Sequence, residues 1–158
     1  MSWDWIIAAG VCVVFVALEG LMAGRGVKAA LADIRQPRWA APLPVWVALG
    51  IVYYGLCLAT LARLLAHDSH AALWTGIVLI KLMAANAVWN LIFFRMRRFG
   101  WALAFNIAYI LLFLIFWRRL AEVDPLMTRL WGLYAAYQIY AVAWGWAVWR
   151  LNRQGPAG

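Results

Sequence analysis

Charged residues are scarce in this sequence. They make up 13% of the 158 residues, whereas hydrophobic residues make up 68%. Soluble domains typically contain about 25% charged and about 45–50% apolar residues. A soluble fold cannot bury so much apolar surface, so lipid must cover it. The composition predicts an integral membrane protein.

Acidic residues are especially few, because six Asp and Glu stand against 14 Lys and Arg, for a formal net charge of +8. A basic excess can indicate nucleic-acid binding, but here the basic residues form short clusters at the ends of apolar runs. That placement is typical of topology signals and of contact with anionic lipids. We therefore expect membrane lipids as partners and no nucleic acid.

Patterns for catalysis or metal binding are also missing. Cys12 and Cys57 lie alone in separate apolar runs, without the spacing of a zinc site. His67 and His70 share a short polar turn, where solvated histidines are commoner than a metal or haem site. We predict no catalytic residue, no metal site and no obligatory cofactor. The first residues lack the basic region of a signal peptide, so we expect the first apolar run to remain in the mature protein.

Five apolar runs each approach the ~20 residues that cross a bilayer core. They cover about 3–22, 45–66, 72–94, 100–117 and 130–149. Strand-like alternation is absent, and backbone in lipid must form its own hydrogen bonds, so we expect helices. The predicted fold class is all-α: an integral membrane bundle of five transmembrane helices, forming a single domain over 1–158.

Basic residues predict the orientation of this bundle, because cytoplasmic loops are enriched in Lys and Arg. One side holds a single acid, Asp33, and nine bases: Arg25, Lys28, Arg35, Arg38, Arg95, Arg97, Arg98, Arg150 and Arg153. The other side balances acids and bases. We expect a multi-pass protein of the bacterial inner membrane, with its amino terminus outside and its carboxy terminus in the cytoplasm.

The long cytoplasmic loop 23–44 ends in a proline-rich stretch around Trp39. Prolines stiffen such a stretch. Two interpretations remain open: the loop packs over the bundle, or Trp39 is a plain anchor at the membrane interface.

The third run carries polar groups that are unusual in lipid. At about 100° per residue, Asn86, Trp89, Asn90 and Phe93 share an arc of about 100°. Two amides and two aromatic rings are typical of an apolar pocket with a few orienting polar groups, although the asparagines can instead bond between helices. We favour the pocket.

Lys81 lies on another face, near the middle of the bilayer. Glu19 differs from it in depth by roughly 15 Å at 1.5 Å per residue, too far for an ion pair. We hypothesise that Lys81 meets a ligand carboxylate. In the last run, Tyr134, Tyr137 and small residues below them form a stripe that suits a flat aromatic ligand or a close helix.

These residues resemble the translocator protein family, also called the tryptophan-rich sensory protein family (TspO/MBR, peripheral benzodiazepine receptor). The similarity begins at Pro37-Arg-Trp39, and it is firmest at Asn86-Ala-Val-Trp89 with Phe93-Phe94. It continues through Leu133-Tyr134-Ala-Ala-Tyr137 and ends at Trp149-Arg-Leu-Asn152.

Several positions depart from the family pattern. Gly50 stands where a tryptophan is usual, Leu133 replaces a proline, Tyr137 replaces a tryptophan, and Gly145 stands where helix 5 normally carries an asparagine. The chain therefore resembles a divergent member with an altered ligand preference.

The resemblance implies a receptor or carrier that binds porphyrin, haem or sterol-like lipids, forms homodimers, and takes part in tetrapyrrole handling, transport or stress signalling. Together with Lys81 from the residue pattern, the expected ligand-binding residues are Trp39, Trp46, Tyr54, Lys81, Asn86, Trp89, Asn90, Phe93, Tyr134 and Tyr137. Two alternatives remain. The chain is an accessory subunit that contacts other membrane proteins, or a porphyrin-degrading enzyme that uses its aromatic residues.

Overall fold

The computed structural model describes residues 2–24 and 26–153. Arg25, one of the bases used above for orientation, lies outside them. Within the described residues, every regular element is a helix. These elements are α1 (Trp3–Ala23), α2 (Val27–Asp33), α3 (Leu43–Leu65), α4 (His70–Asn90), a π-helical turn η1 (Leu91–Arg95), α5 (Phe99–Val123) and α6 (Pro125–Asn152).

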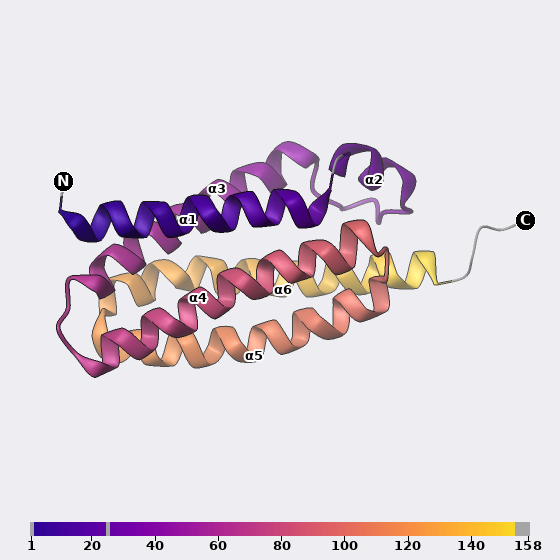
Figure 1. Ribbon diagram of the computed structural model, residues 1–158. Helices are drawn as coiled ribbons and strands as arrows, with labels where there is room; N and C mark the ends of the chain where they lie inside the picture. The colour runs from indigo at the N-terminus through magenta and orange to yellow at the C-terminus, as the bar shows by residue number, and fades with distance from the viewer. Residues whose placement is uncertain (1, 25, 154–158) are drawn as a thin grey trace, which may run out of the picture.

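The long helices lie lengthwise beside one another and alternate in direction, so the two termini lie at opposite ends of the bundle (Figure 1). Helix α1 packs against α3 and α4, α4 against α5, and α5 against α6. Short α2 lies at the end where the chain leaves α6 (Figure 1). This end is called the α2 end below, and the opposite one the far end.

Helix lengths correct several sequence-based boundaries. Pro125 lies between the predicted spans 100–117 and 130–149, but it begins α6, because proline suits the first helical turn, where its missing N–H is not needed. Helix α5 continues past Trp117 to Val123. The loop 23–44 contains α2, which is too short for a recognisable period. Two glycines just before α2, Gly24 and Gly26, take φ values of 78° and 102°, which favour glycine.

Four helical segments are long and apolar enough to cross a membrane: α1, α3, α4 with η1, and α5. Their bounds, Trp3–Ala23, Leu43–Leu65, His70–Arg95 and Phe99–Val123, lie close to the predicted ones except at the end of α5. The fifth expected span corresponds to α6, which is not among these four candidates. The predicted all-helical membrane bundle is therefore confirmed, and its fifth crossing is not.

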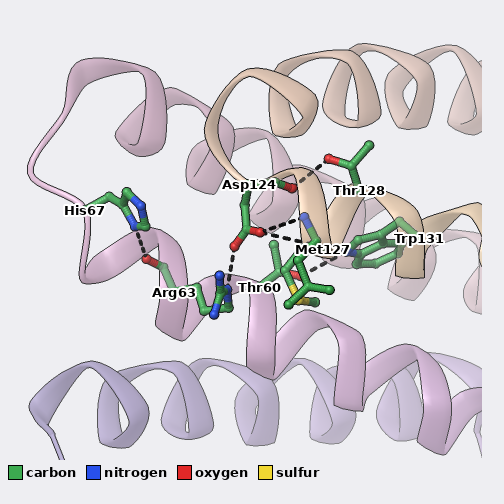
Figure 2. A network of polar contacts seen from close by, with 8 residues as sticks. Thr60, Arg63, His67, Asp124, Met127, Thr128 and Trp131 are labelled. Carbon is green, nitrogen blue, oxygen red and sulfur yellow. Dashed lines mark hydrogen bonds and ion pairs between the residues drawn. The ribbon is translucent and has the colours of Figure 1, made fainter.

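Polar contacts hold the far end together (Figure 2). Asp124 caps α6 by accepting hydrogen bonds from the backbone N–H groups of Leu126 and Met127, and it pairs with Arg63 of α3. Next to it, buried Trp131 donates to the Thr60 hydroxyl across 2.9 Å. Apolar residues including Phe113, Phe116 and Leu79 pack around this network. At the far end, α3 and α6 are therefore joined by both polar and apolar contacts.

The α2 end is built differently. Asn152, the last residue of α6, hydrogen-bonds to both the N–H and the carbonyl of Arg35, at 3.0 and 2.9 Å. The Tyr140 hydroxyl accepts from the Ala41 N–H at 2.8 Å. Of the two interpretations of the loop, packing over the bundle is therefore confirmed. Trp39 is 51% exposed and sets its ring edge-on to Tyr140.

Candidate functional site

A cavity of about 240 Å³ lies inside the bundle near the α2 end. Helices α2, α3, α4 with η1, and α6 all contribute to its wall, and α1 contributes one residue. The lining residues are Glu19, Val27, Leu31, Leu43, Trp46, Val47, Leu49, Gly50, Tyr53, Asn86, Trp89, Asn90, Phe94, Tyr134, Tyr137 and Trp144. Its volume falls just below the roughly 300–1,000 Å³ of sites for drug-sized ligands.

Aromatic rings in mutual contact surround much of this cavity. Trp144 contacts Trp46 at 4.8 Å between centroids, and Trp46 contacts Tyr137 at 6.1 Å. The series continues from Tyr137 to Tyr134 at 5.5 Å and from Tyr134 to Tyr53 at 5.2 Å. Offset and edge-on contacts of this kind each add about 0.5–1.5 kcal/mol beyond area burial. This aromatic belt, Trp46, Tyr53, Tyr134, Tyr137 and Trp144, gives the cavity a stiff apolar wall.

Glu19 closes the wall on the side of α1. Its Oε1 accepts a 2.6 Å hydrogen bond from the Tyr54 hydroxyl and a 2.5 Å bond from Asn86 Nδ2. The carboxyl group thereby joins α1 to α3 and α4 at the level of the cavity. Two short hydrogen bonds to the same oxygen fix the position of this carboxyl group. Asn90 Nδ2 donates to the backbone carbonyl of Asn86 at 3.0 Å, which holds the side-chain amide of Asn90 in place.

The π-helical turn decides which phenylalanine reaches the cavity. A π turn inserts one extra residue into an α-helix, so Phe94 takes the angular place that regular α-helical rotation predicts for Phe93. Phe94 lines the cavity. Phe93 is 3% exposed and stacks on Trp89, with centroids 4.9 Å apart and an interplanar angle of 16°. Such bulges are frequent at functional sites.

A smaller hollow of about 50 Å³ continues from the cavity between α4, α5 and α6. It adds Asn106, Tyr109 and Gln138 to the lining. Within the described chain, three buried polar atoms here and in the belt have no hydrogen-bond partner: Tyr53 Oη, Gln138 Oε1 and Trp144 Nε1. Buried polar groups are normally paired. These three atoms therefore carry the cost of burial without a partner in the described part of the chain.

Six of the ten sequence-predicted site residues line the cavity: Trp46, Asn86, Trp89, Asn90, Tyr134 and Tyr137. Four lie outside its lining. Tyr54 supports Glu19, Phe93 supports Trp89, Trp39 lies in the covering loop, and Lys81 is exposed on α4. The geometry therefore gives no support to a role for Lys81 within the cavity.

Sequence reasoning missed Glu19, Tyr53, Phe94 and Trp144. The signal for Glu19 was present, because it is the only ionisable group well inside the first apolar run. Its partners are the uncharged Tyr54 and Asn86, not the cationic Lys81. Gly50, noted above as a departure from the family pattern, also lines the cavity.

The two histidines lie away from this site, at the far end. His67 Nδ1 lies 2.8 Å from the Arg63 carbonyl, and both imidazoles are exposed. Over residues 2–24 and 26–153, no three His, Cys, Asp or Glu side chains gather in a group that could hold a metal ion.

Comparison with known proteins adds one finding. No curated protein matches the sequence. The family model described as the TspO/MBR family matches residues 8–150, which include all five long helices in whole or in large part. The chain is thus a multi-pass integral membrane protein, and it belongs to the TspO/MBR family.

Proposed function

We propose that this protein is a membrane receptor or carrier that binds a tetrapyrrole, such as porphyrin or haem, or a sterol-like lipid in the cavity at the α2 end. The observation that carries this proposal is the cavity wall, which combines the aromatic belt with two asparagines. Flat, largely apolar ligands stack on such rings, and the amides of Asn86 and Asn90 can orient a polar substituent.

Ligand size has a consequence for the loop 23–44. A tetrapyrrole macrocycle is larger than a cavity of about 240 Å³. Val27 and Leu31 of α2 form part of the wall, and exposed polar contacts such as Arg97 with Asp33 hold α2 in place. Exposed ion pairs contribute little, about 0–1 kcal/mol. A large ligand would therefore enter by displacing α2, and its propionates would meet the basic surface around Arg95.

The proposed topology includes α6 as a fifth crossing. Its 28 residues span about 42 Å at 1.5 Å per residue, longer than a bilayer core of about 30 Å. It also runs beside α5 along the bundle (Figure 1). Five crossings and the basic α2 end favour an amino terminus outside and a carboxy terminus in the cytoplasm of a bacterial inner membrane. Reporter fusions at each terminus test this: a carboxy-terminal fluorescent protein that stays dark contradicts it.

Titration with protoporphyrin IX tests ligand binding directly. Purified protein in detergent is expected to quench its tryptophan emission saturably, because Trp46, Trp89 and Trp144 line the cavity. Replacing Tyr137 with alanine removes a belt residue and should weaken binding several-fold, since each aromatic contact contributes about 0.5–1.5 kcal/mol. Leu133→Ala is the matched control, because Leu133 lies on the same helix and is 74% exposed. Quenching that does not saturate, or that is equal in both variants, refutes the proposal.

We also propose a homodimer. Helix α3 supports it, because Val47, Ile51 and Gly55 follow one another at helical spacing and are exposed, and nothing packs within 4 Å of a Cβ placed at Gly55. Gentle solubilisation followed by mass measurement tests this. A clean dimer supports it, whereas co-migration with other membrane proteins favours the accessory-subunit alternative.

A further inference from the structure

The charge of the cavity wall is the feature that the ligand classes above leave unexplained. Among the residues that line the cavity, Glu19 is the only one of a charged type. No Lys, Arg or His lines the cavity. The remaining polar groups are neutral amides and tyrosine hydroxyls. A carboxylic ligand such as a porphyrin propionate would therefore meet no cation inside the cavity.

Glu19 has no cationic partner within the protein either. Among the described residues, the ion pairs are those of Arg63 with Asp124, Arg97 with Asp33 and Arg118 with Glu122. Tyr54 and Asn86 both donate to Oε1, and no hydrogen bond from the described chain reaches Oε2. Acids within the apolar part of a membrane protein are costly and usually pair with another group. This carboxyl group is held in place by two donors, and one of its oxygens remains available.

The aromatic belt adds a second and independent preference for positive charge. The face of an aromatic ring carries negative potential, and cages of Trp and Tyr bind quaternary ammonium groups. Trp46, Tyr53, Tyr134 and Tyr137 belong to the same wall as Glu19. The Glu19 carboxylate and the aromatic rings thus both favour a positively charged ligand.

We infer that the cavity selects lipophilic cations: apolar molecules that carry a protonated amine or a quaternary ammonium group, which lies between Glu19 and the aromatic belt. This inference rests on the proposed function, because it assigns a ligand class to the same cavity. It reverses the ligand charge expected from Lys81. The volume of about 240 Å³ accommodates a small aromatic group carrying such a cation without displacement of α2.

The test uses three probes with different substituents on the same naphthylmethyl group; the cation and the neutral probe match in size and shape and differ only in charge. The cation carries trimethylammonium, the neutral isostere carries tert-butyl in its place, and the anion carries carboxylate. Equilibrium dialysis against the full chain in nanodiscs of zwitterionic phosphatidylcholine measures each dissociation constant, with empty nanodiscs subtracted for partitioning. The cation should bind about tenfold more tightly than the neutral isostere, and the anion should bind most weakly.

Variants then assign the preference to Glu19. Glu19→Gln retains the size and an acceptor for Tyr54 and Asn86, and the ratio between cation and isostere should fall to within about threefold. Glu19→Asp retains the charge and should retain most of the preference. Glu122→Gln removes an equally charged but exposed side chain that pairs only with Arg118, and it should leave the ratio unchanged.

Three outcomes overturn the inference: equal binding of cation and isostere by the unaltered protein, tighter binding of the anion, or an unchanged ratio in Glu19→Gln. The first two need no variant, so they decide the matter even where Glu19→Gln fails to fold. Protoporphyrin titration of the same preparation separates the two proposals. Saturable porphyrin quenching without preference for the cation overturns this inference alone, whereas no saturable binding of any probe overturns both.

Discussion

Asp124 offers the sharpest test of how the far end of the bundle is held together. The residue is 4% exposed, and each of its carboxylate oxygens has its own hydrogen-bond partners. Oδ1 accepts from the backbone N–H groups of Leu126 and Met127 at 3.1 Å, and Oδ2 accepts from Arg63 Nε (Figure 2). Asp124→Ala removes both the cap and the ion pair with Arg63. Asp124→Asn retains an oxygen for the cap and removes the charge.

The expected loss of stability in Asp124→Ala is estimated from the loss of the helix cap. Replacing an N-cap aspartate with alanine costs about 0.5–2 kcal/mol, and about 1 kcal/mol lowers the melting temperature of a chain of this size by about 2–4 °C. We therefore expect Asp124→Ala to melt about 1–8 °C below the unaltered protein in detergent, and Asp124→Asn to lie between the two. Glu122→Gln is the control, because its carboxylate lies two residues away and is exposed.

The pH dependence of the melting temperature distinguishes the contribution of the Asp124 charge from that of its capping hydrogen bonds. Burial alone would raise the pKa of Asp124, but the hydrogen bond from Arg63, the backbone N–H groups of α6 and the positive charge of Arg63 together lower the pKa below its ordinary value. A lowered native pKa stabilises the fold fully above the unfolded value of about 3.9, and this contribution is lost as pH falls through the native pKa. Asp124→Asn should therefore melt with a flatter pH dependence below about pH 5. A slope equal to that of the unaltered protein, or an Asp124→Ala melting temperature equal to that of Glu122→Gln, refutes this reasoning.

Three further substitutions test other contacts through the melting temperature or proteolysis. Gly100→Ala would place a Cβ 3.0 Å from Trp149 Nε1, and such overpacking costs about 1–3 kcal/mol. The better helix propensity of alanine, about 1 kcal/mol, offsets only part of this cost, so the melting temperature should fall. Trp131→Phe leaves the Thr60 hydroxyl without its donor at a cost of about 1–3 kcal/mol, and adding Thr60→Val should recover part of the loss. Asn152→Ala releases the loop ahead of α3, so limited proteolysis should cut that loop faster while cleavage elsewhere is unchanged.

The helices could be predicted from composition because lipid imposes a simple rule: backbone in an apolar medium must bond to itself. For that reason, the predicted spans agree with α1, α3 and α4 to within a few residues. The rule says less about helix ends outside the apolar layer. The predicted fifth run therefore begins at about residue 130, although α6 begins at Pro125.

The site was predictable only where helical rotation stays regular. Asn86, Trp89 and Asn90 precede the π turn, and all three line the cavity as their shared arc predicts. Beyond Asn90 the helix widens into a π turn, so Phe94 lines the cavity where regular rotation predicts Phe93. Hydrogen bonds between helices have no signal in sequence spacing. The contacts that tie Glu19 to Tyr54 and Asn86 join residues 35 and 67 positions apart, so only the packed bundle reveals them.

Helix α6, which we propose as the fifth crossing, shows how a helix that lines a binding site can fall short of the hydropathy of a membrane span. It is the one long helix in the described part of the chain that falls short of the criterion for an apolar span. The residues that lower its hydropathy include Tyr134, Tyr137 and Gln138, which line the cavity or its extension. Polar atoms directed inward do not meet lipid, so they carry no cost of transfer into hydrocarbon. A low hydropathy in one helix of a membrane bundle is therefore a reason to look for a ligand beside that helix.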